Sequence, residues 1–420
     1  MKDSLFSTLI HLKGNTRACV YTEPLWGLSM NLCMPYLSVY MLALGLNDSR
    51  IGLIVSISLL SQIVFSFLSG PITDKIGRRW ATAIFDVLGW CIPALIWWRA
   101  ENFLFFLIAA IINGTNGVTA NSWTCLLIED ADKKQITRIF SLTTAFGQLS
   151  AVFAPITAVL ISRLTLVPAI RILFLNGFIL MALKIIILYI ASRETGIGKM
   201  RIAETKGKNI FHLSGGYGGV IKMILKSRGM VFSIVIAALS WITGTINNTF
   251  WQIIVNKKLL VPEAVLPYFN IFKSALAIIF LFFVIPKLLK GILKMPLVFA
   301  FSSYLIGQSL LIMIPVEGAV KYPLILLSLV FDGFAVGALA MLGESLINIH
   351  VNPNERARIL AIRFMFIMLA TAPFGWIGGI LSEMSRNLPF VMNLVILVFG
   401  IVITLIYYRK SNDHSAEIHR

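Results

Sequence analysis

The sequence predicts an all-α membrane protein with twelve transmembrane helices in two pseudo-symmetric six-helix bundles. Of its 420 residues, 58% are hydrophobic and only 13% are charged, whereas soluble domains carry roughly 25% charged residues. A large core does not account for this difference, because even large soluble folds must cover their surface with polar groups. Lipid as the surrounding solvent does account for it, since each spanning helix needs about 20 apolar residues.

Apolar runs of spanning length occur twelve times along the chain. Six lie near 18–46, 50–72, 80–99, 102–128, 138–162 and 169–192, and six lie near 229–255, 265–286, 292–315, 321–349, 359–382 and 388–408. The runs lack the period-two alternation of outer-membrane strands, and helices satisfy the backbone hydrogen bonds that lipid cannot. We therefore expect an N-terminal bundle over 1–192, a basic linker over 193–228, a C-terminal bundle over 229–410 and a tail over 411–420.

Lysine and arginine mark the orientation of the predicted helices. The net charge is +17, but the basic residues sit in short gaps between apolar runs, which disfavours a nucleic-acid partner and is typical of cytoplasmic loops. They gather in alternate gaps and in the linker, while the opposite loops hold scattered single charges and one pair, Lys257 and Lys258. With an even number of spans, both termini are expected in the cytoplasm and the protein in the cell membrane.

The two halves are weakly related in sequence. Arg138 precedes Pro155 by 17 residues, and Arg356 precedes Pro373 by the same distance. Asn113-Gly114 and Asp332-Gly333 occupy matching places in the fourth and tenth predicted helices. Such correspondences indicate a duplicated six-helix unit whose halves meet at a central axis.

The loop after the second predicted helix carries the most specific motif. It reads Gly70-Pro-Ile-Thr-Asp74-Lys75-Ile-Gly77-Arg78-Arg79 and resembles the G-x-x-x-D-[RK]-x-G-[RK]-[RK] hallmark of the major facilitator superfamily (MFS). Together with twelve spans and a basic central linker, the resemblance covers essentially the whole chain. It implies the MFS fold and transport of a small molecule by alternating access between the two halves.

The residue types of this loop suggest individual roles. Gly70 would let helices approach closely, Gly77 would take a left-handed turn, and Arg78 and Arg79 would reach the lipid headgroups. The resemblance implies a conformational latch, with the aspartate facing the start of the eleventh helix; its members here are Gly70, Asp74, Lys75, Gly77, Arg78, Arg79 and Arg356. The alternative is a basic loop that only sets topology.

The sequence departs at two places from the pattern of the proton-driven drug exporters of this superfamily. Proton-driven drug exporters of this superfamily usually carry an arginine in the fourth helix, four residues before a glycine, where this chain has Ala110 before Gly114. Their G-P-x-x-G-G signature in the fifth helix is degraded here to Ala154-Pro155-Ile-Thr-Ala158. A standard proton-driven drug antiporter is therefore disfavoured.

Polar side chains concentrate in the helices that, by the resemblance, line the central cavity. The uncharged candidates for substrate contact are Asn31, Asn113, Asn116, Trp123, Asn247, Asn248 and Trp251. Amides and aromatic rings can hydrogen-bond and stack on a neutral polar solute such as a sugar, glycoside or nucleoside. The alternative for each is interhelical hydrogen bonding by asparagine and interface anchoring by tryptophan.

Charges inside the membrane are costly and usually face a cavity or form pairs. The deepest are Lys273 and Asp332, for which we expect an ion pair or a shared substrate site. Asp332 is also a candidate proton or cation carrier, and Glu23 is the second coupling candidate, with a surface position at the helix start as its alternative.

Roles can be suggested for four other charges within the predicted helices. For Asp86 we expect a structural partner, and Lys184 would either snorkel to the cytoplasmic face or pair with an acid. Glu344 joins the substrate or coupling candidates, and from depth alone Arg363 is expected to face it.

No enzyme signature is present, since the chain lacks His-Glu-x-x-His, Gly-x-Ser-x-Gly and phosphate-loop motifs. No cofactor and no metal site are expected. The sequence favours a monomeric secondary transporter of a small organic solute, coupled to an ion such as the proton. The alternatives are an efflux antiporter for amphipathic compounds and a non-transporting membrane sensor or scaffold.

Overall fold

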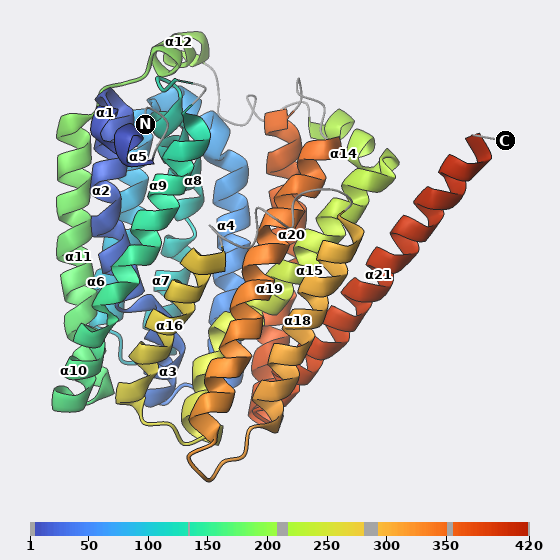
Figure 1. The fold of residues 1–420 in the computed structure, drawn as a ribbon. Coiled ribbons are helices and arrows are strands. Elements are labelled where there is room, and N and C mark those ends of the chain that lie inside the picture. The colour runs from blue at the N-terminus through green and yellow to red at the C-terminus, as the bar shows by residue number, and fades with distance from the viewer. Residues whose placement is uncertain (1–4, 133–134, 208–216, 281–292, 351–355, 419–420) are drawn as a thin grey trace. The chain divides into compact units, whose positions relative to one another are not determined.

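The computed structural model describes residues 5–132, 135–207, 217–280, 293–350 and 356–418 (Figure 1). In these ranges the regular secondary structure consists of helices, joined by turns and short irregular segments, without strands. The chain forms two compact units. Unit 1 comprises Met1–Leu46, Ile57–Gly216 and Glu263–Asn270, and unit 2 comprises Asn47–Ser56, Tyr217–Pro262 and Ile271–Arg420.

Unit 1 is built mainly from the helices that precede the linker and from one helix at the start of the linker, α12. They are α1 (Leu5–His11), α2 (Gly14–Asn31), η1 (Met34–Tyr36), α3 (Leu37–Ala43), α4 (Asp48–Ile76), α5 (Arg78–Asp86), η2 (Val87–Cys91), α6 (Ile92–Trp98), α7 (Phe103–Asn113), α8 (Asn116–Ile128), α9 (Ile136–Leu149), η3 (Ser150–Phe153), α10 (Ala154–Leu164), α11 (Leu166–Ala191) and α12 (Gly196–Thr205). Helix α2 packs against α8, α9 and α11, and α5 packs against α8. These contacts bring α2, α5, α8 and α11 together around the pocket described below.

Unit 2 contains one helix from the end of the linker, α14, and the helices that follow the linker. They are α14 (Tyr217–Lys226), α15 (Arg228–Ile253), η4 (Ile254–Lys258), α18 (Lys294–Met313), α19 (Lys321–His350), α20 (Arg356–Met384) and α21 (Leu388–Ile418). The short η5 (Glu263–Val265) belongs to unit 1, while α4 and α16 (Leu266–Ile279) contribute residues to both units. Helix α18 packs on α19 and α21, and α15 packs on α19 and α20.

Among the described residues, nine helical segments are long and apolar enough to span a membrane. Each falls on one of the twelve predicted runs, from Asp48–Ile76 to Leu388–Arg409. Of the other three runs, 18–46 and 138–162 are divided into shorter helices, and 265–286 begins with α16 and continues outside the described residues. The all-α, multi-span architecture predicted from composition is confirmed.

Prolines explain where the two divided runs are interrupted. Pro35 lies in η1, between α2 and α3, and Pro155 follows η3 near the start of α10. A proline ring disfavours the helical conformation of the preceding residue and removes one backbone donor. Each predicted run therefore becomes two shorter helices around a tight 3₁₀ turn.

Candidate functional site

A pocket of about 400 Å³ lies within unit 1. Its walls come from five helical segments and a π-helical turn, and its lining residues are Glu23, Trp26, Gln62, Asp86, Trp90, Asn116, Thr119, Ala120, Trp123, Thr124 and Lys184. The volume falls within the roughly 300–1,000 Å³ of small-molecule sites. Three of the predicted candidates, Glu23, Asn116 and Trp123, meet here.

Two of the charges in this pocket form a buried ion pair. The Lys184 ammonium on α11 lies 3.3 Å from the Asp86 carboxylate at the end of α5, and the two side chains are 4% and 1% exposed. The predicted structural partner of Asp86 is therefore confirmed, and Lys184 pairs with an acid instead of snorkelling. Burial of either charge alone would be costly, whereas the pair is electrically neutral.

Glu23 is the third charged group of the pocket. It is buried on α2, at 9% exposure, and Lys184 and Asp86 act on it electrostatically. Within the described residues no hydrogen bond or ion pair within 4 Å holds its carboxylate. The carboxylate thus faces a cavity without a fixed partner, and the alternative of a surface position for Glu23 is wrong.

Aromatic and amide groups complete the pocket wall. Trp26 and Trp90 meet edge to face, with ring centroids 5.9 Å apart. Trp123 has a buried indole N–H without an acceptor in the described structure. Gln62 donates to the Asn116 side-chain oxygen over 2.7 Å, so one amide acceptor is already engaged. The wall combines aromatic surface with a few polar groups, as ligand sites do.

Two other predicted candidates serve the packing of unit 1. Asn31 donates to the Gly147 carbonyl and Asn113 donates to the Gly89 carbonyl, each over 2.7 Å. Gly89 lies in the π-helical turn η2, where the altered backbone pattern leaves a carbonyl available. For these two residues the structure supports the interhelical alternative.

A second polar cluster lies in the core of unit 2. Asp332, at 3% exposure, accepts hydrogen bonds from Gln308 over 2.7 Å and from Asn247 over 3.5 Å. Asn393 donates to the Gln308 oxygen over 3.2 Å. Gln308 and Asn393 were not predicted, because they lie on the ninth and twelfth predicted helices, outside the set that, by the resemblance, lines the central cavity. A polar residue in an otherwise apolar helix was the available signal.

Lys273 belongs to the same region but has a different neighbour. Its ammonium lies 3.6 Å from the centroid of the buried Trp251 ring, a cation–π contact that partly offsets burial. The expected ion pair with Asp332 is not among the described contacts within 4 Å, although the two charges act on each other electrostatically. Asn248 is exposed on α15.

Glu344 and Arg363 form an ion pair of 2.7 Å between α19 and α20. The arginine side chain is 9% exposed and the glutamate side chain is 58% exposed. The contact expected from depth alone is therefore confirmed, which favours a structural role for Glu344 over contact with a substrate.

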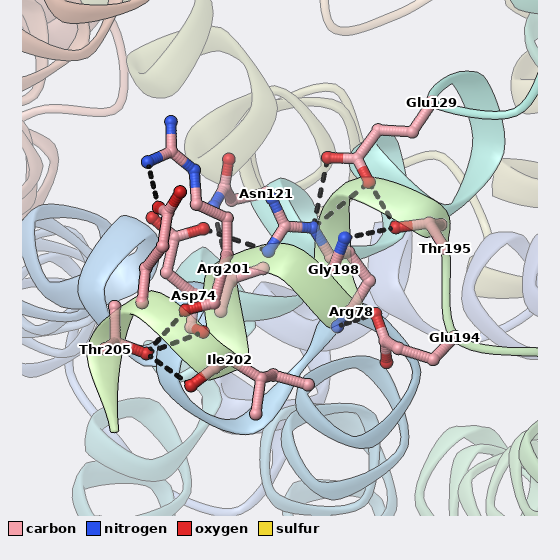
Figure 2. Close-up of polar contacts among 12 residues, drawn as sticks. Asp74, Arg78, Asn121, Glu129, Glu194, Thr195, Gly198, Arg201, Ile202 and Thr205 are labelled. Atoms are coloured by element: carbon pink, nitrogen blue, oxygen red, sulfur yellow. Dashed lines mark hydrogen bonds and ion pairs between the residues drawn. The ribbon is translucent and has the colours of Figure 1, made fainter. Parts of the chain in front are cut away.

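The motif loop of unit 1 is held by a network of charges, shown in Figure 2. Arg78 is 4% exposed, and its guanidinium lies 3.0 Å from Glu129 and 2.9 Å from Asp74. The expectation that Arg78 reaches the lipid headgroups is wrong, because two carboxylates bind it inside the unit. Arg79 turns toward Tyr189, whose carbonyl accepts from it over 2.6 Å.

The start of the linker packs on the same loop. Glu194 accepts hydrogen bonds from the backbone N–H groups of Arg78 and Arg79, over 2.9 and 3.1 Å, and so caps the start of α5. Gly77 has φ +89°, and a side chain there would collide with Glu194 and Ile202. The positive φ predicted for Gly77 is present, but with ψ +159° the residue is extended, so the left-handed helical turn expected there is not formed.

The remaining residues of the predicted latch show no contact in the described structure that supports a latch. A Cβ at Gly70 would meet no atom within 4 Å, so the close helix approach expected there is absent. Asp74 contacts Arg78 within unit 1, and Lys75 lies at the end of α4. The Arg356 side chain lies outside the described residues, and the latch stays a prediction.

Comparison with known proteins assigns the sequence to a family. The Major Facilitator Superfamily model matches residues 25–316. The uncharacterized MFS-type transporter YqjV of Bacillus subtilis is 28% identical over 131 residues, which cover 31% of this chain and 32% of that protein. The quinolone resistance protein NorA of Staphylococcus aureus is 26% identical over 129 residues, covering 30% and 33%. The chain thus aligns with about a third of the length of these curated relatives.

Solved structures agree at the level of the fold. The nucleoside transporter NupG has a TM-score of 0.72 at 14% identity, covering 94% of this chain and 99% of that one. A POT family transporter in complex with 5-aminolevulinic acid has a TM-score of 0.71 at 16% identity, covering 95% and 96%. Since the family model spans more than half of the sequence, the chain belongs to the Major Facilitator Superfamily and is a multi-pass membrane protein.

Proposed function

We propose that the chain is a secondary active transporter that carries a small organic solute by alternating access, coupled to a proton gradient. Family membership supports transport, and the pocket of unit 1 supports a solute of drug or metabolite size. The single observation that carries the coupling is Glu23, a buried carboxylate that faces this pocket without a hydrogen-bond partner in the described residues.

The electrostatics of the pocket explain why Glu23 is the preferred coupling residue. Asp86 is already neutralised by Lys184 at 3.3 Å. An ionised carboxylate in a largely apolar cavity is costly unless it is protonated or paired. Glu23 therefore has reason to bind a proton when the pocket is empty, and to release it when occupancy or hydration changes.

Asp332 is the second coupling candidate, now in unit 2. Its nearest hydrogen-bond donors are the neutral amides of Gln308 and Asn247. Amide donors stabilise a carboxylate without neutralising it, so this group also has reason to take up a proton. It differs from Glu23 because it lies in a hydrogen-bonded core instead of a pocket wall.

The experiment is transport by purified protein in proteoliposomes, with and without an imposed proton gradient. The solutes are nucleosides, peptides, quinolones and aromatic cations. We expect wild-type protein to accumulate at least one solute against its gradient. Glu23→Gln should abolish accumulation but leave downhill exchange, because a neutral amide cannot carry a proton.

Gly244→Ala is the matched control, because a Cβ at Gly244 would meet no atom within 4 Å and the residue lies outside the pocket. It should accumulate solute as the wild type does. Gradient-driven accumulation that is equal in Glu23→Gln and wild-type protein would contradict coupling through Glu23. If Asp332→Asn then abolishes accumulation, the coupling residue lies in unit 2.

Efflux of amphipathic compounds is the second candidate function. The aromatic side chains of Trp26, Trp90 and Trp123 favour it, because a wall of rings binds apolar solutes of varied shape. The partial similarity to NorA, named as a quinolone resistance protein, points the same way. Reduced quinolone susceptibility of cells that express the chain, lost in Glu23→Gln, would establish the export direction. A non-transporting sensor would bind solutes without flux in any of these assays.

A further inference from the structure

Helix α14 lies where the linker joins unit 2, beside α20 and at the start of α15 (Figure 1). Only Ser227 separates α14 from α15, and its extended backbone (φ −90°, ψ 107°) ends one helix before the next begins. The segment that follows, Arg228–Lys258, is long and apolar enough to span a membrane. A helix of 10 residues extends about 15 Å, so α14 stays close to the surface of the bilayer that α15 enters.

Apolar side chains of α14 face both the protein and its surroundings. Ile224 is 1% exposed and packs in an apolar cluster with Ile359 and Ile362 of α20, which holds α14 against unit 2. Leu225 and Met223 point away from this contact and are 64% and 38% exposed. Beside a spanning helix, acyl chains of the bilayer can cover such exposed apolar area.

Lys222 and Lys226 form a basic stripe along the same helix. Both side chains are exposed, and residues four positions apart lie on one helical face. With about 100° between successive residues, Leu225 lies next to the stripe on the side of Lys222, and Met223 lies next to it on the side of Lys226. Such a helix lies along a membrane surface with its apolar side chains among the acyl chains and its ammonium groups at the headgroups.

The protein supplies no acidic partner for this stripe in the part of the chain that the structure describes. The sequence contains no aspartate or glutamate between Glu204 and Glu263. Of the two helices that pack on α14, α15 has no acidic residue and α20 has only Glu383, in its last turn. No ion pair among the described residues involves Lys222 or Lys226. The stripe therefore presents two positive charges to its surroundings.

From this we infer that α14 binds the anionic phospholipids of the bilayer surface, with Lys222 and Lys226 at the lipid phosphates and with Leu225 and Met223 among the acyl chains. This surface lies outside the unit 1 pocket, and its role does not depend on which solute the protein carries. It holds the end of the linker against the membrane where unit 2 begins. A zwitterionic lipid has the same acyl chains but no net charge, so preference for an anionic lipid is the property that distinguishes this surface.

The test uses the full-length chain in nanodiscs, with the native cysteines replaced and a fluorophore attached at Gly219→Cys. A Cβ at Gly219 would meet no atom within 4 Å, and this residue lies one helical turn before Lys222. The nanodiscs contain phosphatidylglycerol and phosphatidylcholine in equal amounts, and one or the other lipid carries a quenching doxyl group. We expect labelled phosphatidylglycerol to quench about threefold more efficiently than labelled phosphatidylcholine, because each lysine attracts the anionic headgroup. High salt should remove this preference by screening the charges.

Two double variants separate the stripe from the general charge of the linker. Lys222→Gln with Lys226→Gln should make the two lipids quench equally. Lys199→Gln with Lys206→Gln removes the same charge from the same linker at two exposed positions, and should keep the preference. Leu225→Asn should weaken quenching by both lipids but keep the preference, because it removes an apolar contact and no charge. Gel filtration shows whether each variant is folded, and the comparison of the two lipids in the parent protein needs none of these substitutions.

Equal quenching by the two lipids in the parent protein at low salt would overturn the inference. A preference that survives the loss of Lys222 and Lys226 would also overturn it. Equal loss of the preference in both double variants would show that only the net charge of the linker matters, which contradicts a site on α14. Weak quenching by both lipids would place α14 away from the bilayer and would favour a protein partner for its exposed face instead.

Discussion

The ion pair between Lys184 and Asp86 shows what holds a charged side chain inside a membrane bundle. Both groups are almost fully buried, and the two residues, which lie on different helices, are 98 positions apart in sequence. Removing two charges from water is costly, and their attraction offsets this cost only while both partners are present. A single substitution therefore has a larger effect than removal of the whole pair.

Replacing Lys184 tests this asymmetry at the residue scale. Lys184→Met should destabilise the protein by about 3–5 kcal/mol, because it leaves Asp86 ionised and buried without a partner. The double variant Lys184→Met with Asp86→Asn should recover most of this loss. Denaturant or thermal unfolding of the purified protein measures both. A double variant that is as unstable as the single one would show that packing, not charge, dominates at this site.

At the scale of the helix, glycines on α4 and α20 create a close crossing within unit 2. A Cβ at Gly375 would lie 2.9 Å from the Gly52 carbonyl oxygen and 2.8 Å from the Ser56 hydroxyl. Small residues four positions apart let helix backbones approach closely in membranes. The crossing is reinforced where α4 begins, because Asp48 forms an ion pair with Arg386.

Gly375→Ala should therefore destabilise the protein by about 1–3 kcal/mol, the usual effect of overpacking. The matched control is again Gly244→Ala, on a helix surface with no atom within 4 Å of the new methyl group. That change should be neutral or slightly stabilising, because alanine favours helix by roughly 0.5–1 kcal/mol over glycine. Melting temperatures of the two variants provide the comparison, and equal values would refute a tight crossing at Gly375.

The elements themselves were largely predictable, because spanning length and apolar composition are local properties. The interruptions at Pro35 and Pro155 follow from the same local chemistry, although the twelve-run reading did not place them. Contacts between distant segments were not predictable in this way. Nothing local to Asp86 indicates Lys184 as its partner, and Gln308 reaches Asp332 only because α18 packs on α19.

The residues of the candidate site were likewise only partly predictable from local sequence. Glu23 and Trp123 were selected as polar or aromatic residues of helices that, by resemblance, line a cavity, and the unit 1 pocket contains both. Asn31 and Asn113 met the same criterion, yet their amides bind backbone carbonyls. Residue type and helix number do not specify the rotation of a helix about its axis, which decides whether an asparagine faces a cavity or a neighbour.

For the whole molecule, orientation in the membrane is the property that sequence predicts without structural help. The linker over 193–228 is densely basic, whereas the segment between α18 and α19 contains Glu317 and precedes a single lysine, Lys321. Basic loops are retained in the cytoplasm. The linker, and with it both termini, should therefore face the cytoplasm, and Glu317 should face the outside.

Cysteine labelling in whole cells tests this orientation. In a variant with the four native cysteines replaced, Glu317→Cys should react with a membrane-impermeant maleimide in intact cells. Glu204→Cys, at another exposed glutamate, on α12 of the linker, should react only after permeabilisation, because the bilayer shields it. The reverse labelling pattern would show that the protein is inserted in the opposite orientation, with both termini outside the cell. Labelling of both positions from outside would require an even number of spans between α12 and Glu317, whereas the predicted division into two six-helix bundles places three there.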